Sequence, residues 1–140
     1  MARARLVTDL AGRVAAEVER QHRLLARWLG TECDSSVLDE LRESHSPGFT
    51  MTTAEGAALA AEDLFSGLAE ARNTAPGLEI GVDDIELVAS SPGLAVVRFR
   101  ETHRHHGGTT QRRTTAVLRQ DPAAPNGFRW QHVHETTVGF

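Results

Sequence analysis

The 140-residue sequence contains no lysine and no tyrosine, and it has a single cysteine, Cys33. One cysteine excludes an internal disulfide and is typical of a protein in the reducing cytosol, so we expect a cytoplasmic location. No apolar run approaches the roughly 20 residues that a membrane helix needs. Asp9 interrupts the arginine-containing start, which is unlike a secretory signal. These absences predict a protein with no membrane partner.

All 15 basic residues are arginine, they are scattered along the chain, and 19 acidic residues give a net charge of -4. Nucleic-acid binding needs a basic stripe or interleaved aromatic side chains, and the sequence holds only five Phe and two Trp. We therefore expect no nucleic-acid partner. The composition, 40% hydrophobic and 24% charged, predicts one globular domain over residues 1–140.

The first half of the chain has a helical period. Its apolar residues recur at steps of three and four: Leu10, Val14, Val18, Leu25 and Leu29. This stripe predicts an amphipathic helix over 9–29, capped by Asp9 and closed by Gly30 in the left-handed conformation. A second helix is predicted over 36–43 and a third over 61–72. A short strand at 49–53 lies between them.

The second half has the period of strands, which are predicted over 78–89, 94–103, 110–120 and 128–138. Short turns join them, as in an antiparallel meander. The apolar residues of the first of these strands change phase near Gly81 and 83–84, so we expect a β-bulge there. Helices followed by a meander predict an α+β fold with the helices on one face of a curved sheet.

The chain ending, from Asn126 to Thr136, resembles that of the nuclear transport factor 2-like superfamily, in which a Gly-x-Trp turn leads to histidines at alternate positions. Trp130, His132 and His134 fit this habit. The closest likeness is to the SnoaL-like branch and to the association domain of calcium/calmodulin-dependent kinase II. The resemblance implies a cystatin-like cone of order α-α-β-α-β-β-β-β, with a pocket inside. It also implies a homodimer formed through the outer face.

Alternation along the strands predicts which side chains line that pocket. On the last strand Trp130, His132 and His134 share one face, and on the strand from Leu94 apolar residues give way to Glu101 and His103. We assign both faces to the concave side. The predicted ligand-binding residues are Trp130, His132, His134, Phe99, Met51 and Thr114.

Glu101 and His134 are the candidate catalytic residues, because a carboxylate in an apolar cavity, or an imidazole, can act as a base near neutral pH. The His132-x-His134 pair could alternatively hold a metal with Glu101 or His103, or serve only as buried hydrogen-bonded imidazoles. We assign no metal and no cofactor. The steroid-isomerase reaction of the superfamily needs a tyrosine oxyanion donor, which this sequence lacks.

Three functions remain open at this stage. The first is a small-molecule-binding protein that forms a homodimer. The second is an acid–base enzyme, such as an isomerase, cyclase, dehydratase or hydrolase, acting on a small hydrophobic substrate. The third is an association module without activity. An enzyme should show titratable groups of perturbed pKa inside a shielded cavity, whereas a pure association module should show a filled cone.

Overall fold

The computed structural model describes residues 2–139, with side chains from Asp9 to Gly139. Over these residues three helices and six strands form, in the predicted α+β order with one strand added. They are α1 (Ala2–Gly30), α2 (Ser36–Glu43), β1 (His45–Thr52), β2 (Ala58–Ala60), α3 (Ala61–Glu70), β3 (Glu79–Ser91), β4 (Leu94–His105), β5 (Gly108–Gln120), the short 3₁₀ turn η1 (Pro125–Gly127) and β6 (Phe128–Thr137). The short strand β2 was not predicted.

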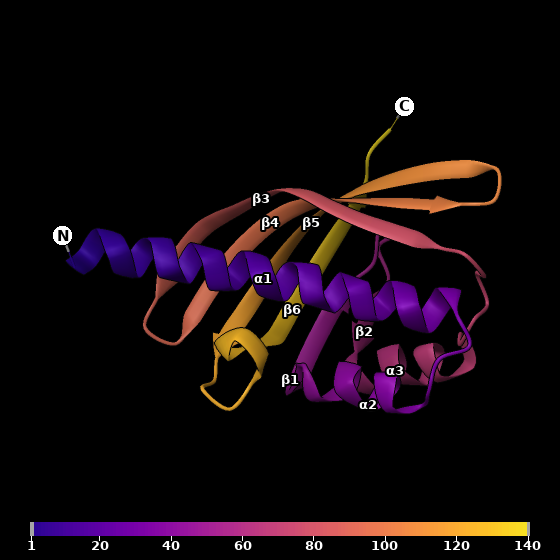
Figure 1. Cartoon of the computed structure of the whole chain (residues 1–140), viewed down its shortest axis with the longest axis horizontal. Coiled ribbons are helices and arrows are strands. Elements are labelled where there is room, and N and C mark those ends of the chain that lie inside the picture. The colour runs from indigo at the N-terminus through magenta and orange to yellow at the C-terminus, as the bar shows by residue number, and fades with distance from the viewer. Residues whose placement is uncertain (1, 140) are drawn as a thin grey trace.

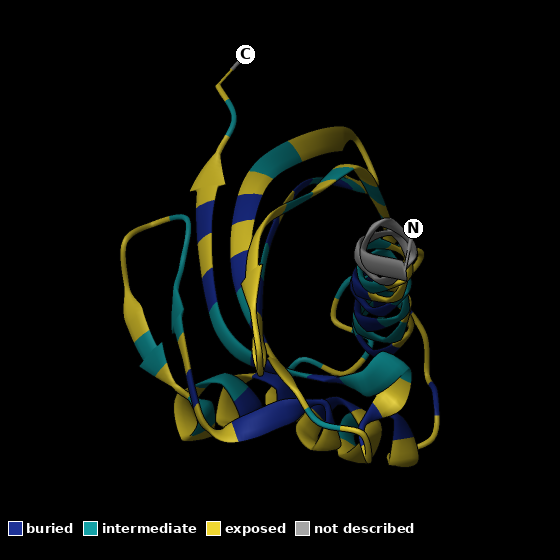
Figure 2. Ribbon diagram, turned by 90° about the vertical axis from the view of Figure 1, so that its left-hand side faces the viewer, coloured by how far each residue is buried: buried dark blue, intermediate teal, exposed yellow. Residues whose placement is uncertain are grey.

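The six strands form one mixed sheet in the order β2-β1-β6-β5-β4-β3. Strands β3 to β6 are the antiparallel meander that the sequence predicts, and β1 adds to it parallel to β6. The sheet curves around α1, while α2 and α3 lie together at one end of it (Figure 1). Seen end-on, the concave side of the sheet faces α1 (Figure 2). This is the expected α+β cone.

Helix α1 differs from its prediction at both ends. It begins at Ala2, so Asp9 is not its N-cap, because the preceding alanine, arginine and leucine residues are strong helix formers that extend it. Gly30 is not left-handed. A Cβ atom there would lie 3.0 Å from the backbone nitrogen of Leu78. The glycine therefore serves a close approach between two backbones rather than a turn.

The predicted bulge in β3 is present. The pairing with β4 shifts register between Asp83 and Glu86, and Asp84 between them has a φ of 55°. A bulge of this kind bends the strand and increases its twist. Val82 and Ile85, on either side of the bulge, pack against the buried cluster that contains Val14 and Val18 of α1.

Buried apolar side chains form two clusters. One lies between α1 and the sheet and includes Val14, Val18, Val97, Phe99, Leu118, Phe128 and Trp130. The other joins the end of α1 to α2 and α3 and includes Trp28, Val37, Leu41, Phe65 and Leu68. Where the two clusters meet, side chains do not fill the cone completely, and that gap is the candidate site.

Candidate functional site

A cavity of about 170 Å³ lies between α1, α3 and the concave side of the sheet. A dry cavity of about 150 Å³ is large enough to admit benzene, so this one has room for a molecule the size of a single ring. Its apolar lining consists of Leu25, Leu29, Phe49, Met51, Leu64, Leu68, Ile80, Phe99, Trp130 and Val133. Its polar lining consists of Gln21, His22, His45, Glu101, His103, Arg112, Thr114 and Glu135.

Glu101 on β4 is the centre of the polar part of the lining, and it is only 3% exposed. Its Oε2 accepts a hydrogen bond from the Thr114 hydroxyl at 2.6 Å, and its Oε1 lies 3.0 Å from Nε2 of His103. Nε2 of His22 on α1 lies 3.4 Å from the same Oε1. Burial alone would raise the pKa of Glu101, but these three neighbours together hold it well below its usual range. Glu101 is therefore ionised.

Glu135 on β6 is a second buried carboxyl group beside the first. Its Oε1 accepts a hydrogen bond from Nη1 of Arg112 at 3.3 Å. Burial and the adjacent charge of Glu101 raise the pKa of Glu135 to about 7, although Arg112 acts in the opposite direction. Two neighbouring carboxyl groups thus differ in protonation near neutral pH. Such a separation is common where one group must give or take a proton.

His22 forms the floor of this polar region. Its Nδ1 lies 2.7 Å from the Val18 carbonyl oxygen, and its ring packs edge-on against Phe99 and Trp130, with centroids 5.1 and 6.1 Å away. Burial lowers the pKa of His22, but the adjacent carboxylate of Glu101 outweighs this and leaves the pKa raised. Helix α1 therefore supplies a titratable group directly to the cavity.

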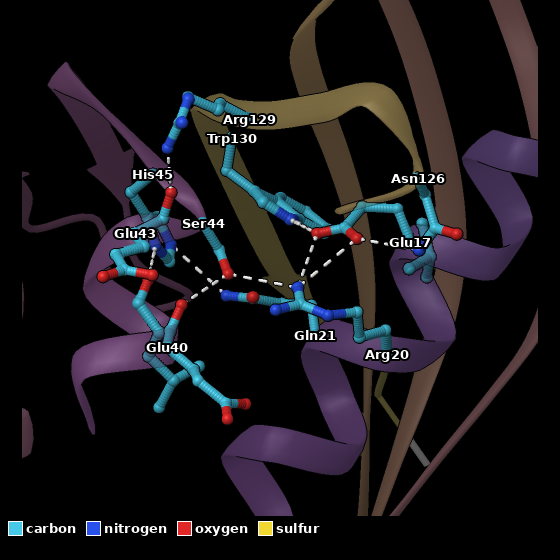
Figure 3. Close-up of polar contacts among 12 residues, drawn as sticks. Glu17, Arg20, Gln21, Glu40, Glu43, Ser44, His45, Asn126, Arg129 and Trp130 are labelled. Atoms are coloured by element: carbon cyan, nitrogen blue, oxygen red, sulfur yellow. Dashed lines mark hydrogen bonds and ion pairs between the residues drawn. The ribbon is translucent and has the colours of Figure 1, made fainter. Parts of the chain in front are cut away.

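A neutral polar pair, Gln21 and His45, lies elsewhere in the lining. The Nδ1 of His45 donates to the Leu41 carbonyl oxygen at 2.6 Å, and its Nε2 lies 3.3 Å from Nε2 of Gln21 (Figure 3). Burial lowers the pKa of His45 to about 4, so the ring is neutral and accepts this contact from the Gln21 amide. The pair provides a polar surface without a net charge.

Behind the cavity wall, Glu17 of α1 holds Trp130 in place. The carboxylate of Glu17 accepts hydrogen bonds from the Trp130 indole at 2.9 Å and from the Asn126 amide at 3.1 Å (Figure 3). The Arg20 guanidinium lies 3.3 Å from it and also donates to the Ser44 hydroxyl. This network fixes the turn before β6 and the aromatic wall of the cavity against the helix.

Five of the predicted site residues lie where the sequence placed them. Phe99, Glu101 and Thr114 face the cavity from the meander, Trp130 faces it from β6, and Met51 faces it from β1. The alternation along β4 and β5 therefore predicts their inward faces correctly. Their roles in binding or catalysis stay predictions.

The predicted placement of His132 and His134 is wrong. Trp130 pairs with Leu118 and His132 pairs with Val117, so Gln131 is an extra residue that shifts the register of β6. Beyond this bulge the alternation is inverted. His134 is exposed, and both imidazoles lie on the convex side, in a surface groove lined by Arg113, Thr115, Val117, His132, His134 and Thr136. His132 pairs there with the Thr50 hydroxyl at 2.7 Å.

The same inversion removes the metal alternative that the sequence left open. His132 and His134 lie across the sheet from Glu101 and His103, so these four side chains cannot share one ion. Among the described side chains, no three His, Cys, Asp or Glu residues gather as a metal site requires. His134 lies on the opposite face of β6 from the cavity and so cannot serve as its base, and Glu135 occupies the inward position instead.

Two features of the sequence indicate cavity-lining residues that were not among the predicted site residues: Gln21, His22 and Glu135. The apolar stripe of α1 is interrupted between Val18 and Leu25, and the vacant positions on that face are Gln21 and His22. On the last strand Val133 is out of phase with Trp130, which is the same sign of a bulge that β3 shows. That phase change places Glu135 inside.

Comparison with solved structures finds the same fold in several proteins, although no family model and no curated protein matches the sequence. An NTF-2 like protein of unknown function from Pseudomonas aeruginosa is 28% identical, with a TM-score of 0.85 over 91% of this chain and 99% of that one. The CaMKII hub of S. rosetta is 15% identical, with a TM-score of 0.73 over 91% and 95%.

A protein from Novosphingobium aromaticivorans, provisionally assigned as a scytalone dehydratase, is 12% identical. Its TM-score is 0.72, over 99% of this chain and 89% of that one. At such identities the latter two likenesses concern the fold alone. Within residues 2–139 no helix combines the length and the apolar character that crossing a bilayer demands. The cone, its element order and these structural neighbours together show that the chain has the fold of the nuclear transport factor 2-like superfamily.

Proposed function

We propose that the cone binds a small, largely apolar molecule that carries one hydrogen-bonding group. The observation that carries this proposal is the cavity of about 170 Å³, which has an apolar wall and a polar region built from buried, oriented side chains. Phe99, Trp130 and Met51 would contact the apolar body of the ligand. Glu135 would meet its polar group, because both oxygens of Glu101 already have partners.

The proposal predicts that binding depends on the concave face and is indifferent to the convex one. Single-ring compounds carrying one hydroxyl, carbonyl or amine group should raise the melting temperature of the protein. Glu135→Gln should weaken the binding of the best compound at least tenfold. Met51→Trp should abolish it by filling the apolar part of the cavity.

His134→Gln is the matched control, since His134 precedes Glu135 on β6 but faces outward, and it should bind the compound as the wild type does. Protein-observed NMR with the same compounds locates the site by the signals that shift. Equal loss of binding in the His134 and Glu135 variants, or shifts confined to the convex face, would contradict the proposal.

One observation favours acid–base catalysis as a second candidate. The pKa of Glu135 is about 7, and this buried carboxyl group lies beside the ionised Glu101 in the cavity lining. Glu135, rather than Glu101 or His134, is then the residue positioned to exchange a proton. Its carboxylate would take a proton from a carbon next to a carbonyl group, and the C–H electron pair would form the enolate.

Proton exchange of this kind is measurable without knowing the natural substrate. In D₂O, the wild type should speed the exchange of the α-protons of cyclohexanone, followed by proton NMR. Glu135→Gln should lose at least 90% of that rate, and His134→Gln should keep it. A rate equal to that of buffer for the wild type would eliminate this candidate for ketones while leaving the binding proposal intact.

We also propose a homodimer in the cytoplasm, formed through the convex side of the sheet. Its surface groove, lined by Arg113, Val117 and His134 among others, mixes apolar and charged side chains as a wet interface does. The likeness to a CaMKII hub is compatible with association. Sedimentation velocity of the full chain measures this directly, and a monomer at micromolar concentration would contradict it.

A further inference from the structure

We propose that His22 is a permanently charged imidazolium in the folded protein, and that this buried cation restricts the Glu101–Glu135 pair to one proton, which Glu135 carries. The inference deepens the proposed function, because it names the group through which a ligand in this cavity exchanges a proton. It concerns the ligand-free protein, however, and so can be tested whether or not a ligand is found.

The hydrogen bonds of His22 decide its charge. Its Nδ1 lies 2.7 Å from the Val18 carbonyl oxygen, and a carbonyl can only accept, so Nδ1 carries a proton. If the ring were neutral, Nε2 would then be bare, with its lone pair 3.4 Å from Oε1 of Glu101. Two lone pairs facing each other in a buried site repel. The contact is attractive only when a proton lies between them, on Nε2 of the imidazole or on the carboxyl group.

The other partners of Glu101 place that proton on the imidazole. Oε2 of Glu101 accepts the Thr114 hydroxyl at 2.6 Å, and Oε1 lies 3.0 Å from Nε2 of His103. As a carboxylate, Oε1 can accept a hydrogen bond from both imidazoles at once, whereas a protonated Oε1 could donate to only one of them, so the ionised form satisfies more of these contacts. Glu101 is therefore the acceptor for every group around it, and His22 must be a donor.

Among the described side chains only His103 could share this role with His22, and its side chain is 17% exposed whereas that of His22 is 6% exposed. The charged and titratable side chains that face the pair are His22 from α1, His103 from β4, Arg112 from β5 and His45 from the start of β1. Arg112 forms its ion pair with Glu135, and the ring of His45 is bound to Leu41 and Gln21. Helix α3 and strand β3 contribute only apolar side chains to the lining.

The consequence concerns Glu135. With one full cation beside Glu101 and one guanidinium beside Glu135, ionising both carboxyls would bring two like charges together in a buried site. Glu135 is the member of the pair that lacks a second hydrogen-bond donor among the described residues. It therefore holds the proton of the pair until the pH rises to about 7, and a ligand that contacts the pair gains or loses a proton through Glu135 alone.

The direct experiment is nitrogen NMR of the wild-type protein labelled with ¹⁵N-histidine, recorded from pH 5.5 to 8.5. Both ring nitrogens of His22 should keep the chemical shifts of an imidazolium over this range. A neutral ring with an unprotonated Nε2 at pH 7 would overturn the inference. His22→Gln identifies the signals by their disappearance, and the seven histidines make the spectrum simple enough to assign.

A variant pair tests the effect on Glu135. In His22→Gln, the midpoint at which the Glu135 carboxyl titrates, followed by ¹³C NMR, should rise by about one pH unit or more, because the cation that favours ionisation is gone. His103→Gln is the matched control, since it removes another partner of Glu101 and should shift the midpoint less. An unmoved midpoint in a folded His22→Gln protein would overturn the inference.

If His22→Gln does not fold, the wild-type nitrogen spectrum still decides. The result is also separable from the proposed function. If no compound binds and His22 is charged, the proposed binding function is wrong and the inference about His22 is supported. If compounds bind and His22 is neutral, the binding function is supported and the inference about His22 is wrong.

Discussion

Two buried carboxylates lie where α1 packs against the sheet, Glu17 on the helix and Glu101 on β4, and they differ in the kind of partner that satisfies them. Glu17 receives hydrogen bonds from the neutral indole of Trp130 and the amide of Asn126, and its cation, Arg20, is 21% exposed. Burial leaves the pKa of Glu17 raised in spite of these donors. Glu101, equally buried, has two imidazoles and a hydroxyl within reach, and its pKa is lowered.

The difference shows that satisfying the hydrogen bonds of a buried carboxylate is not the same as neutralising its charge. Around Glu17 the neutral donors fix geometry, and the network joins the helix to the turn before β6 (Figure 3). Around Glu101 the buried imidazolium that we propose for His22 compensates the charge of the carboxylate. The one proton of the carboxyl pair is then on Glu135. One cluster is therefore suited to holding the cone together and the other to exchanging a proton.

The largest expected effect comes from breaking the structural cluster. Glu17→Ala would leave the Trp130 indole and the Asn126 amide without their acceptor and would create a void under the helix. We expect the free energy of unfolding to fall by about 4 kcal/mol, measured by urea denaturation. Glu17→Gln keeps an acceptor oxygen for Trp130 and should cost less than half as much. Equal losses in the two variants would show that charge, and not geometry, is what Glu17 supplies.

A smaller effect, and one that depends on pH, is expected in the proton-exchanging cluster. The pKa of Glu135 is about 7 in the fold, against 4.5 for an ordinary glutamate. The folded state therefore binds this proton more tightly, and the associated stability is complete below pH 4.5 and is lost as pH rises to about 7. Glu135→Gln mimics the protonated group and should be more stable than the wild type by about 3 kcal/mol above pH 7.

The difference in the free energy of unfolding between the wild type and Glu135→Gln should fall toward zero near pH 4.5. Subtracting the two urea-denaturation curves at each pH isolates Glu135 from His45, which acts in the opposite direction. The pKa of His45 is lowered to about 4, so its contribution is present above pH 6.5 and is lost as pH falls to 4. Glu86→Gln, on an exposed ion pair with Arg98, is the control and should show no such pH dependence. A flat difference for Glu135 would refute the shared-proton description.

Much of the fold could be predicted because its signals are local. The stripe from Leu10 to Leu29 indicates α1, and alternating apolar residues indicate the meander. The phase change near Asp83 also predicted the bulge of β3 correctly. The short strand β2 escaped because three residues carry no measurable period, and it forms only through its pairing with β1.

The candidate site was predicted only in part. Phe99, Glu101 and Thr114 were placed correctly because β4 and β5 pair without interruption over that stretch. The two histidines of β6 were placed on the wrong side because one bulged residue, Gln131, inverts every side chain after Trp130. The change of phase at Val133 was visible in the sequence, but the two conspicuous imidazoles suggested the opposite register.

The sequence by itself determined the order of the elements and the face that each regular segment buries, since both follow from the spacing of apolar residues along the chain. Only the tertiary structure decided which imidazoles enter the cone and which carboxyl holds the proton. Those outcomes depend on the register between strands, and on α1 bringing His22 to within 3.4 Å of Glu101, 79 positions along the chain. No local pattern encodes a distance of that kind, because it arises when the helix packs across the curved sheet.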